Sequence, residues 1–131
     1  MARMLGATES YKAGKVIFKE GTYGEGTYVL IDGAVEISKV INDKKILIAK
    51  LGKGDIFGEM SYLDKGPRSA NAIAISDVAV GLMDKDLLDE EINKTAENFR
   101  VIIKALVERL RTTTIELVSM KEQCAKQAAK S

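Results

Sequence analysis

The sequence contains no histidine and no tryptophan, and its 131 residues include one cysteine and one proline. Histidine is the commonest general acid–base near neutral pH and a frequent zinc ligand, so its absence argues against most enzyme and metal-site classes. No apolar run approaches the roughly 20 residues that span a bilayer. The N-terminal stretch MARMLGATES also lacks the apolar core of a secretory signal. These absences favour a non-catalytic chain without a metal site and without membrane attachment.

The charge balance and the single cysteine further limit the binding partners and the cellular compartment that we expect. Lysine and arginine total 20 against 19 aspartate and glutamate residues, which leaves a net charge of +1. This balance supplies no positive field for nucleic acid or an acidic membrane. Cys124 has no second cysteine to pair with, so we expect a reducing, cytoplasmic compartment. Length and composition together predict a single globular domain over residues 1–131.

Residues 11–83 have the pattern of a small β protein. All 11 glycines of the chain lie before residue 82, between short segments rich in β-branched residues. The dipeptides Asp32-Gly33 and Asn42-Asp43 each predict a hairpin between two such segments. Many short strands at near-regular spacing predict an antiparallel β-roll of the jelly-roll type. The predicted strands cover residues 16–18, 27–31, 34–41, 45–51, 69–75 and 78–83.

Residues 84–126 have the pattern of two helices. Asp84 is a predicted N-cap for a short helix over residues 85–92, and Asn93 or Thr95 then begins a long helix without glycine or proline. We expect part of this helix to pack on the roll. Its apolar residues recur on average every 3.5 residues, which is the coiled-coil period. We therefore predict a homodimer formed through the helix from about Thr95 to Cys124. The predicted seam consists of Phe99, Ile103, Leu106, Leu110, Thr113, Leu117, Met120 and Cys124.

The segment between the predicted strands 45–51 and 69–75 carries the residues suited to binding a phosphate. Gly58 permits a close backbone approach, and residues 59–63 predict one or two helical turns whose free amide groups favour an anion. Pro67 stiffens the backbone before Arg68, whose planar guanidinium suits bidentate contact with phosphate oxygens. Glu59 can only accept hydrogen bonds, so it suits a sugar hydroxyl, or a pair with Arg68 when no ligand is bound.

Phe57-Gly58-Glu59 and Arg68-Ser69-Ala70 resemble the phosphate-binding cassette of the cyclic nucleotide-binding domain family, which reads F-G-E followed by R-[S/A/T]-A. The likeness extends from about Tyr11 to Met120. It implies that Glu59 binds the ribose 2′-hydroxyl and that Arg68 binds the cyclic phosphate. The structural alternatives are a solvated arginine at a strand edge and an acid that stabilises a helix N-terminus. The predicted cassette residues are Gly58, Glu59, Met60, Arg68, Ser69 and Ala70.

The resemblance also implies which residues contact the base. Ile37, Ile48 and Leu51 match positions that pack against it, although such residues are equally ordinary in a barrel core. Within the family the sequence is most similar to the bacterial catabolite activator proteins. In those proteins two neighbouring hydroxyl residues on the long helix meet the adenine amino group, one from each subunit. Thr113 and Thr114 match these positions.

The ligand implied is cAMP, with cGMP as the alternative because Ser69 stands where relatives that prefer cGMP carry threonine. No further cofactor is predicted. Catabolite activator proteins continue into a helix-turn-helix domain, whereas this sequence ends at Ser131, so we expect no DNA binding by this chain alone. The leading hypothesis is a non-catalytic, homodimeric cyclic nucleotide sensor. The alternatives are a degenerate β-roll interaction module without a ligand and a small jelly-roll enzyme of cupin type, which the lack of histidine disfavours.

Overall fold

The computed structural model describes residues 5–130. Within them, strands pair antiparallel in two four-stranded sheets, one with the order β1-β8-β3-β6 and the other β2-β7-β4-β5. The two sheets form the predicted β-roll. The strands are β1 (Leu5–Tyr11), β2 (Val16–Phe18), β3 (Tyr28–Asp32), β4 (Val35–Ile41), β5 (Lys44–Leu51), β6 (Ile56–Phe57), β7 (Asn71–Ala74) and β8 (Val78–Met83).

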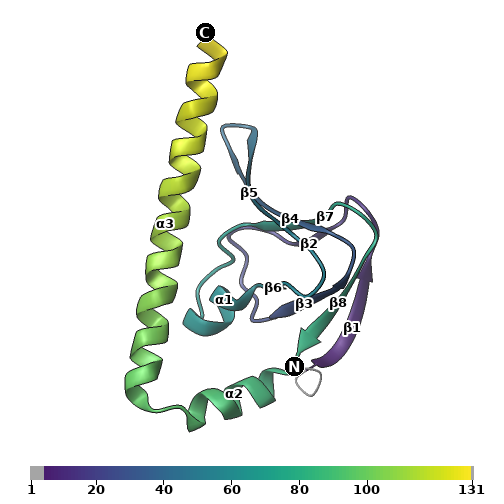
Figure 1. Cartoon of the computed structure of the whole chain (residues 1–131), viewed down its shortest axis with the longest axis vertical. Helices are drawn as coiled ribbons and strands as arrows, with labels where there is room; N and C mark the ends of the chain where they lie inside the picture. Colours follow the sequence, from purple (N-terminus) through teal and green to yellow (C-terminus); the bar gives the residue numbers. More distant parts are fainter. Residues whose placement is uncertain (1–4, 131) are drawn as a thin grey trace.

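Three helices complete the fold over the described residues. The short α1 (Glu59–Asp64) lies between the roll and the long α3 (Glu97–Lys130), and α2 (Lys85–Lys94) leads from the end of β8 to the start of α3 (Figure 1). Asp84 caps α2 as predicted, because its carboxylate accepts hydrogen bonds from the amides of Asp86 and Leu87. None of the helices in residues 5–130 combines the length and the apolar character needed to cross a membrane.

The hydrophobic core lies between the two sheets. Leu30, Val35 and Val80 are completely buried there, and burying a side chain of this size contributes about 1.5–3 kcal/mol. The core ends in an aromatic cluster in which the rings of Tyr28 and Phe57 stack with their centroids 5.1 Å apart. The cluster contacts the predicted cassette, because the guanidinium of Arg68 lies over the Tyr28 ring at 5.9 Å from its centroid.

The predicted strands are confirmed, with bounds that match for β2 and β8. Two strands were not predicted. The first, β1, has the sequence LGATESY, and the side chains between its two end residues are exposed, so it lacks the alternation that marks a half-buried strand. The second, β6, is only two residues long. Both were missed because partner strands rather than local preference hold them in place.

The predicted hairpin at Asn42-Asp43 is confirmed. Strands β4 and β5 pair there with Ile41 opposite Lys44. Asn42 and Asp43 have φ angles of 52° and 63°, the left-handed values that a two-residue type I′ turn requires.

The predicted hairpin at Asp32-Gly33 is wrong. The strands on either side of it, β3 and β4, belong to different sheets, so the chain crosses the roll at this point. Gly33 has a φ of 93°, and a Cβ atom there would lie 2.4 Å from the carbonyl oxygen of Asp77. Glycine is needed here for a left-handed turn that also touches the β7–β8 turn.

Candidate functional site

One pocket brings together every predicted site residue except Thr113. It lies between the roll, α1 and α3, and its volume of about 240 Å³ is near the lower bound of ~300 Å³ usual for small-molecule sites. The cassette forms one wall and α3 forms another. The predicted residues that line it are Ile37, Ile48, Leu51, Gly58, Glu59, Met60, Arg68, Ser69, Ala70 and Thr114.

Arg68 is the buried cation of this pocket. Only 4% of the residue is exposed, so it is not the solvated strand-edge arginine of the structural alternative. Its Nη1 donates a hydrogen bond to the Gly58 carbonyl oxygen at 3.0 Å, and its guanidinium lies over the Phe18 ring at 4.2 Å from the centroid. Burial lowers the pKa of Arg68 below its usual range, and the nearby Tyr28 hydroxyl opposes this only in part.

No carboxylate among residues 5–130 forms an ion pair with Arg68, and the pair with Glu59 considered for the ligand-free state is not formed. A buried charge without a counter-charge is unfavourable. An anion that enters the pocket would supply the missing charge. Arg68 therefore prepares the pocket for a negatively charged group.

Gly58 shapes the backbone beside Arg68. It precedes α1 with a φ of 81°, in the left-handed region, and it stands at the N-cap without a side chain to cap the helix. A Cβ atom at this position would lie 2.7 Å from the Gly26 carbonyl oxygen and 2.8 Å from Nη1 of Arg68. The cassette glycine is therefore required both for its dihedral angle and for the space that Arg68 occupies.

The loop at residues 21–26 is a part of the site that the sequence analysis did not identify. The Arg68 amide donates to the Thr22 carbonyl oxygen, and the Arg68 carbonyl oxygen accepts from the Gly21 amide, both at 2.8 Å. A Cβ atom at Gly24 would come within 3.2 Å of the guanidinium. The sequence around Gly24 carries no local signal of a site, yet the absence of a side chain at Gly24 lets the backbone cover the arginine.

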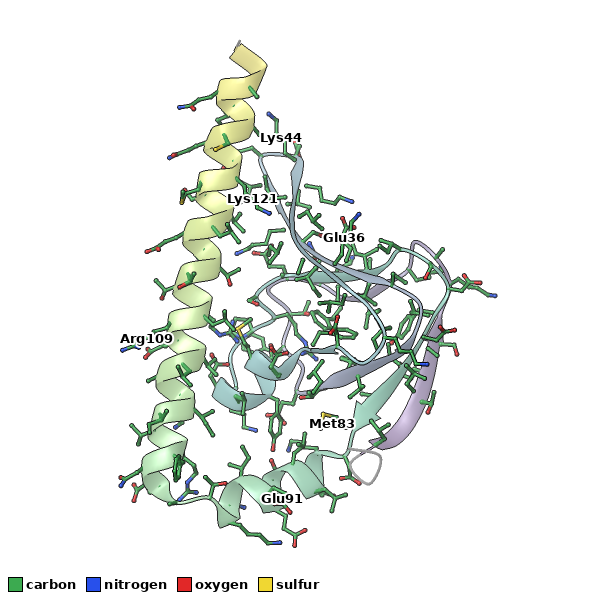
Figure 2. The ribbon with its side chains drawn as sticks, in the orientation of Figure 1. Glu36, Lys44, Met83, Glu91, Arg109 and Lys121 are labelled. Carbon is green, nitrogen blue, oxygen red and sulfur yellow. The ribbon has the colours of Figure 1, made fainter. Side chains whose placement is uncertain are left out.

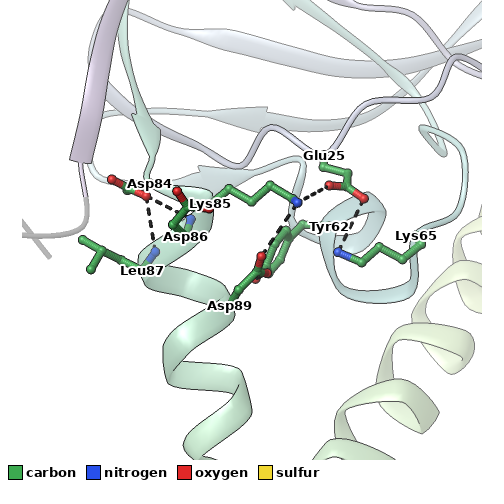
Figure 3. A network of polar contacts seen from close by, with 8 residues as sticks. All are labelled: Glu25, Tyr62, Lys65, Asp84, Lys85, Asp86, Leu87 and Asp89. Atoms are coloured by element: carbon green, nitrogen blue, oxygen red, sulfur yellow. Dashed lines mark hydrogen bonds and ion pairs between the residues drawn. The ribbon is translucent and has the colours of Figure 1, made fainter.

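Polar contacts hold α1 against its neighbours (Figure 3). The hydroxyl of Tyr62 donates to Asp89 of α2, and burial together with this bond raises the pKa of Tyr62 well above its ordinary value. Glu25 of the loop pairs with Lys65 at 3.5 Å and with Lys85 at 3.1 Å. Glu59 lies in the first turn of the helix that these contacts fix.

The two threonines of α3 lie on different sides of that helix. Thr114 is half-buried and lines the pocket, whereas Thr113 is exposed and borders a shallow depression with Glu108 and Arg109. The Thr114 hydroxyl donates to the Leu110 carbonyl oxygen at 2.8 Å. Its proton is thus engaged, so its free lone pairs make it a hydrogen-bond acceptor toward the pocket.

Further lining residues were not predicted to belong to the site. Phe18 belongs to a predicted strand, Phe57 to the family motif and Leu110 to the predicted dimer seam, and none of the three was predicted to line the site. Leu110 lines the pocket while 48% of it remains exposed, so it belongs to both surfaces. The residues missed are Phe18, Ala49, Ile56, Phe57, Ser61 and Leu110.

Comparison with known proteins identifies the family. The family model described as the cyclic nucleotide-binding domain matches residues 8–95. The chain belongs to this family, as the cassette predicted. It is 33% identical over 111 residues to the CRP-like cAMP-activated global transcriptional regulator of Mycobacterium tuberculosis, an alignment that covers 84% of this chain and 50% of the regulator. The chain thus spans about half the length of that relative.

Two solved structures show the same fold. The EAL enzyme Bd1971 in its cAMP-bound form aligns with a TM-score of 0.80 at 27% identity, covering 95% of this chain and 33% of the enzyme chain. The catabolite activator protein of Thermus thermophilus aligns with a TM-score of 0.64 at 31% identity, covering 87% of this chain and 54% of the other.

Proposed function

We propose that this chain is a non-catalytic cAMP sensor that binds its ligand in the pocket beside Arg68 and works as a homodimer. The observation that carries the proposal is the guanidinium of Arg68, which is 4% exposed and has no carboxylate partner in the described part of the chain. The single negative charge of a cyclic phosphate would neutralise it, and the planar fork of donors suits two phosphate oxygens.

The other lining residues supply the remaining contacts that a nucleotide needs. Glu59 would accept a hydrogen bond from the ribose 2′-hydroxyl, and Ser69 with the backbone around Gly58 and Ala70 would add contacts to the phosphate. The apolar wall formed by Ile37, Ile48 and Leu51 suits a planar base. The similarity to a cAMP-activated regulator and to a cAMP-bound enzyme structure supports this ligand class.

The Thr114 hydroxyl favours adenine over guanine. It presents only lone pairs to the pocket, because its proton is bonded to the Leu110 carbonyl oxygen. The six-position of adenine carries an amino group that donates, whereas that of guanine carries an oxygen that accepts. An acceptor facing this position therefore supports cAMP as the preferred ligand.

The proposed dimer rests on the apolar face that α3 leaves uncovered. Val107 and Val118 are buried on the side of the roll, at 5% and 1% exposure. On the seam, Leu106 is 57% exposed and Met120 is 64% exposed. Contiguous apolar surface of this kind marks an interaction site, and the coiled-coil spacing favours a second copy of α3 as the partner.

Titration calorimetry of the wild-type chain tests the ligand. We expect cAMP to bind, and cGMP to bind about tenfold more weakly because an unmatched polar group costs ~1–3 kcal/mol. The 2′-deoxy form of cAMP should also bind more weakly, since it would leave Glu59 without its partner. Absence of binding to all three ligands would refute the sensor and favour a ligand-free interaction module.

A further inference from the structure

A bidentate ion pair joins α1 to α3. Nε of Arg111 donates to Oδ2 of Asp64 at 2.5 Å, and Nη2 donates to Oδ1 at 2.9 Å. The side chains are only 19% and 24% exposed. Burial alone would raise the pKa of Asp64, but hydrogen bonds from Arg111 and the Gly66 amide outweigh it and lower this pKa below its usual value.

The position of Asp64 connects this pair to the cassette. Asp64 is the last residue of α1, and Glu59 is the first. The pair therefore fixes the end of the helix that lies away from the proposed ribose contact. Beyond it, Gly66 packs so closely that a Cβ atom there would lie 3.1 Å from Nη2 of Arg111. Arg68 follows two residues later, so the pair fixes the segment between both proposed ligand contacts.

The position of Arg111 connects the same pair to the other wall of the pocket. Arg111 directly follows Leu110 and precedes Thr114 by less than one helical turn, and both of these neighbours line the pocket. The ion pair is thus a direct polar link between the wall that carries the phosphate contacts and the wall that carries the proposed base contact.

We propose that Asp64 and Arg111 are positioning residues for the cyclic nucleotide site, an inference that rests on the proposed function. The pair holds the cassette and α3 at the separation at which one nucleotide touches both. An exposed pair such as Lys94–Glu90, at 64% and 59% exposure, contributes little to stability because solvent screens it. The Asp64–Arg111 pair is half-buried and has fork geometry, so it can hold two elements in a fixed relation.

The inference is tested by comparing a ligand that touches both walls with one that touches only the cassette. The first is cAMP and the second is ribose 3′,5′-cyclic phosphate, which has no base. Affinities are measured by displacement of a fluorescent cyclic nucleotide for Asp64→Asn, Arg111→Gln and the double variant. Arg111→Lys keeps the charge and loses the fork. The matched control is Arg109→Gln, whose side chain points away from the roll (Figure 2).

We expect each single change to weaken cAMP about tenfold, which corresponds to ~1.4 kcal/mol. The double variant should bind cAMP no more weakly than either single variant, because both remove one shared interaction. Arg111→Lys should fall between wild type and Arg111→Gln. The affinity for the base-free ligand should fall less than about threefold in every variant. Arg109→Gln should bind both ligands with wild-type affinity.

Two kinds of failure are distinguishable. If the wild-type chain binds cAMP and the variants bind it equally well, the positioning role is refuted while the proposed function stands. An equal loss for cAMP and the base-free ligand, accompanied by a lower thermal midpoint of unfolding, also refutes it, because the pair would then be only structural. If the wild-type chain binds neither ligand, the proposed function fails and this inference fails with it.

Discussion

The two ends of the pocket are built differently. At the end proposed to hold the phosphate, Arg68 is 4% exposed and is held by the Gly58 carbonyl oxygen, the Phe18 ring and the loop at residues 21–26. At the other end, α3 contributes Leu110, which is 48% exposed, and the half-buried Thr114. The phosphate end is therefore preorganised within one chain. Base recognition should depend on where α3 lies and on what covers its outer face.

The largest effect should come from removing the preorganised cation. Arg68→Ala would take away the proposed counter-charge of the cyclic phosphate, and loss of one member of such a pair costs ~2–5 kcal/mol, or roughly 30-fold to several thousand-fold in affinity. Calorimetry with cAMP measures this loss, and the thermal midpoint of the ligand-free variant should stay near that of wild type. Undiminished binding would show that the phosphate lies elsewhere.

The next effect concerns the outer face of α3. Leu106→Lys places a charge in the proposed seam, and burying it there would cost several kcal/mol, so the protein should sediment as a monomer. Ile115→Lys is the matched control, because Ile115 is 60% exposed against 57% for Leu106 but lies off the seam. Leu110 lines the pocket and Leu106 does not, so Leu106→Lys tests the dimer without also altering the pocket. A dimeric Leu106→Lys protein would contradict the proposed interface.

A smaller effect should follow from adding one methyl group at the phosphate end. Gly58→Ala forces a left-handed backbone on alanine and places Cβ 2.8 Å from Nη1 of Arg68. Gly54→Ala carries the same backbone strain, since its φ is 92°, but its Cβ would meet nothing within 4 Å. Gly54→Ala should lose about 1–2 kcal/mol of unfolding free energy, measured by urea denaturation, and Gly58→Ala should lose more, because its Cβ would also lie 2.7 Å from the Gly26 carbonyl oxygen. Only Gly58→Ala should also lose about tenfold in cAMP affinity. An equal loss of cAMP affinity in both variants would show that backbone strain alone, and not the contact with Arg68, weakens binding.

These contrasts also show what the sequence could and could not predict. The cassette was predictable because its residues are close in sequence and its chemistry is local: a left-handed glycine, an acid and an arginine after proline. The burial of Arg68 beneath a glycine-containing loop was not, because Gly24 and Arg68 come together only through the fold. For the same reason the pair of Asp64 with Arg111, 47 residues apart, leaves no local signal.

Predictions from turn dipeptides and from helix periodicity agreed with the structure only in part. Asn42-Asp43 and Asp32-Gly33 are both good turn dipeptides, yet only the first joins strands of one sheet. A dipeptide predicts that the chain turns and does not specify which strands then pair. On α3 the residues of the predicted seam are exposed except for the half-buried Ile103 and their role in a dimer stays a prediction, but spacing alone could not decide which of two adjacent threonines faces the pocket. Packing of α3 against α1 and β5 decides it.

The smallest effect should distinguish those two threonines. Thr114→Val keeps the shape of the side chain and removes the acceptor that lines the pocket, so cAMP affinity should fall about fivefold for the loss of ~1 kcal/mol. Because Thr114 belongs to the same chain as the pocket, the loss should persist in the monomeric Leu106→Lys background.

Thr113→Val is the isosteric comparison, and the Thr113 side chain points away from the pocket of its own chain. It should weaken cAMP only in the dimer, if Thr113 meets the base bound to the second copy as the family resemblance implies. Calorimetry with cAMP of both threonine substitutions, each in the wild-type and the Leu106→Lys background, measures the four affinities. If Thr113→Val weakens cAMP equally in the monomer, α3 must rotate when the ligand binds, and the base end of the site would be assembled by the ligand.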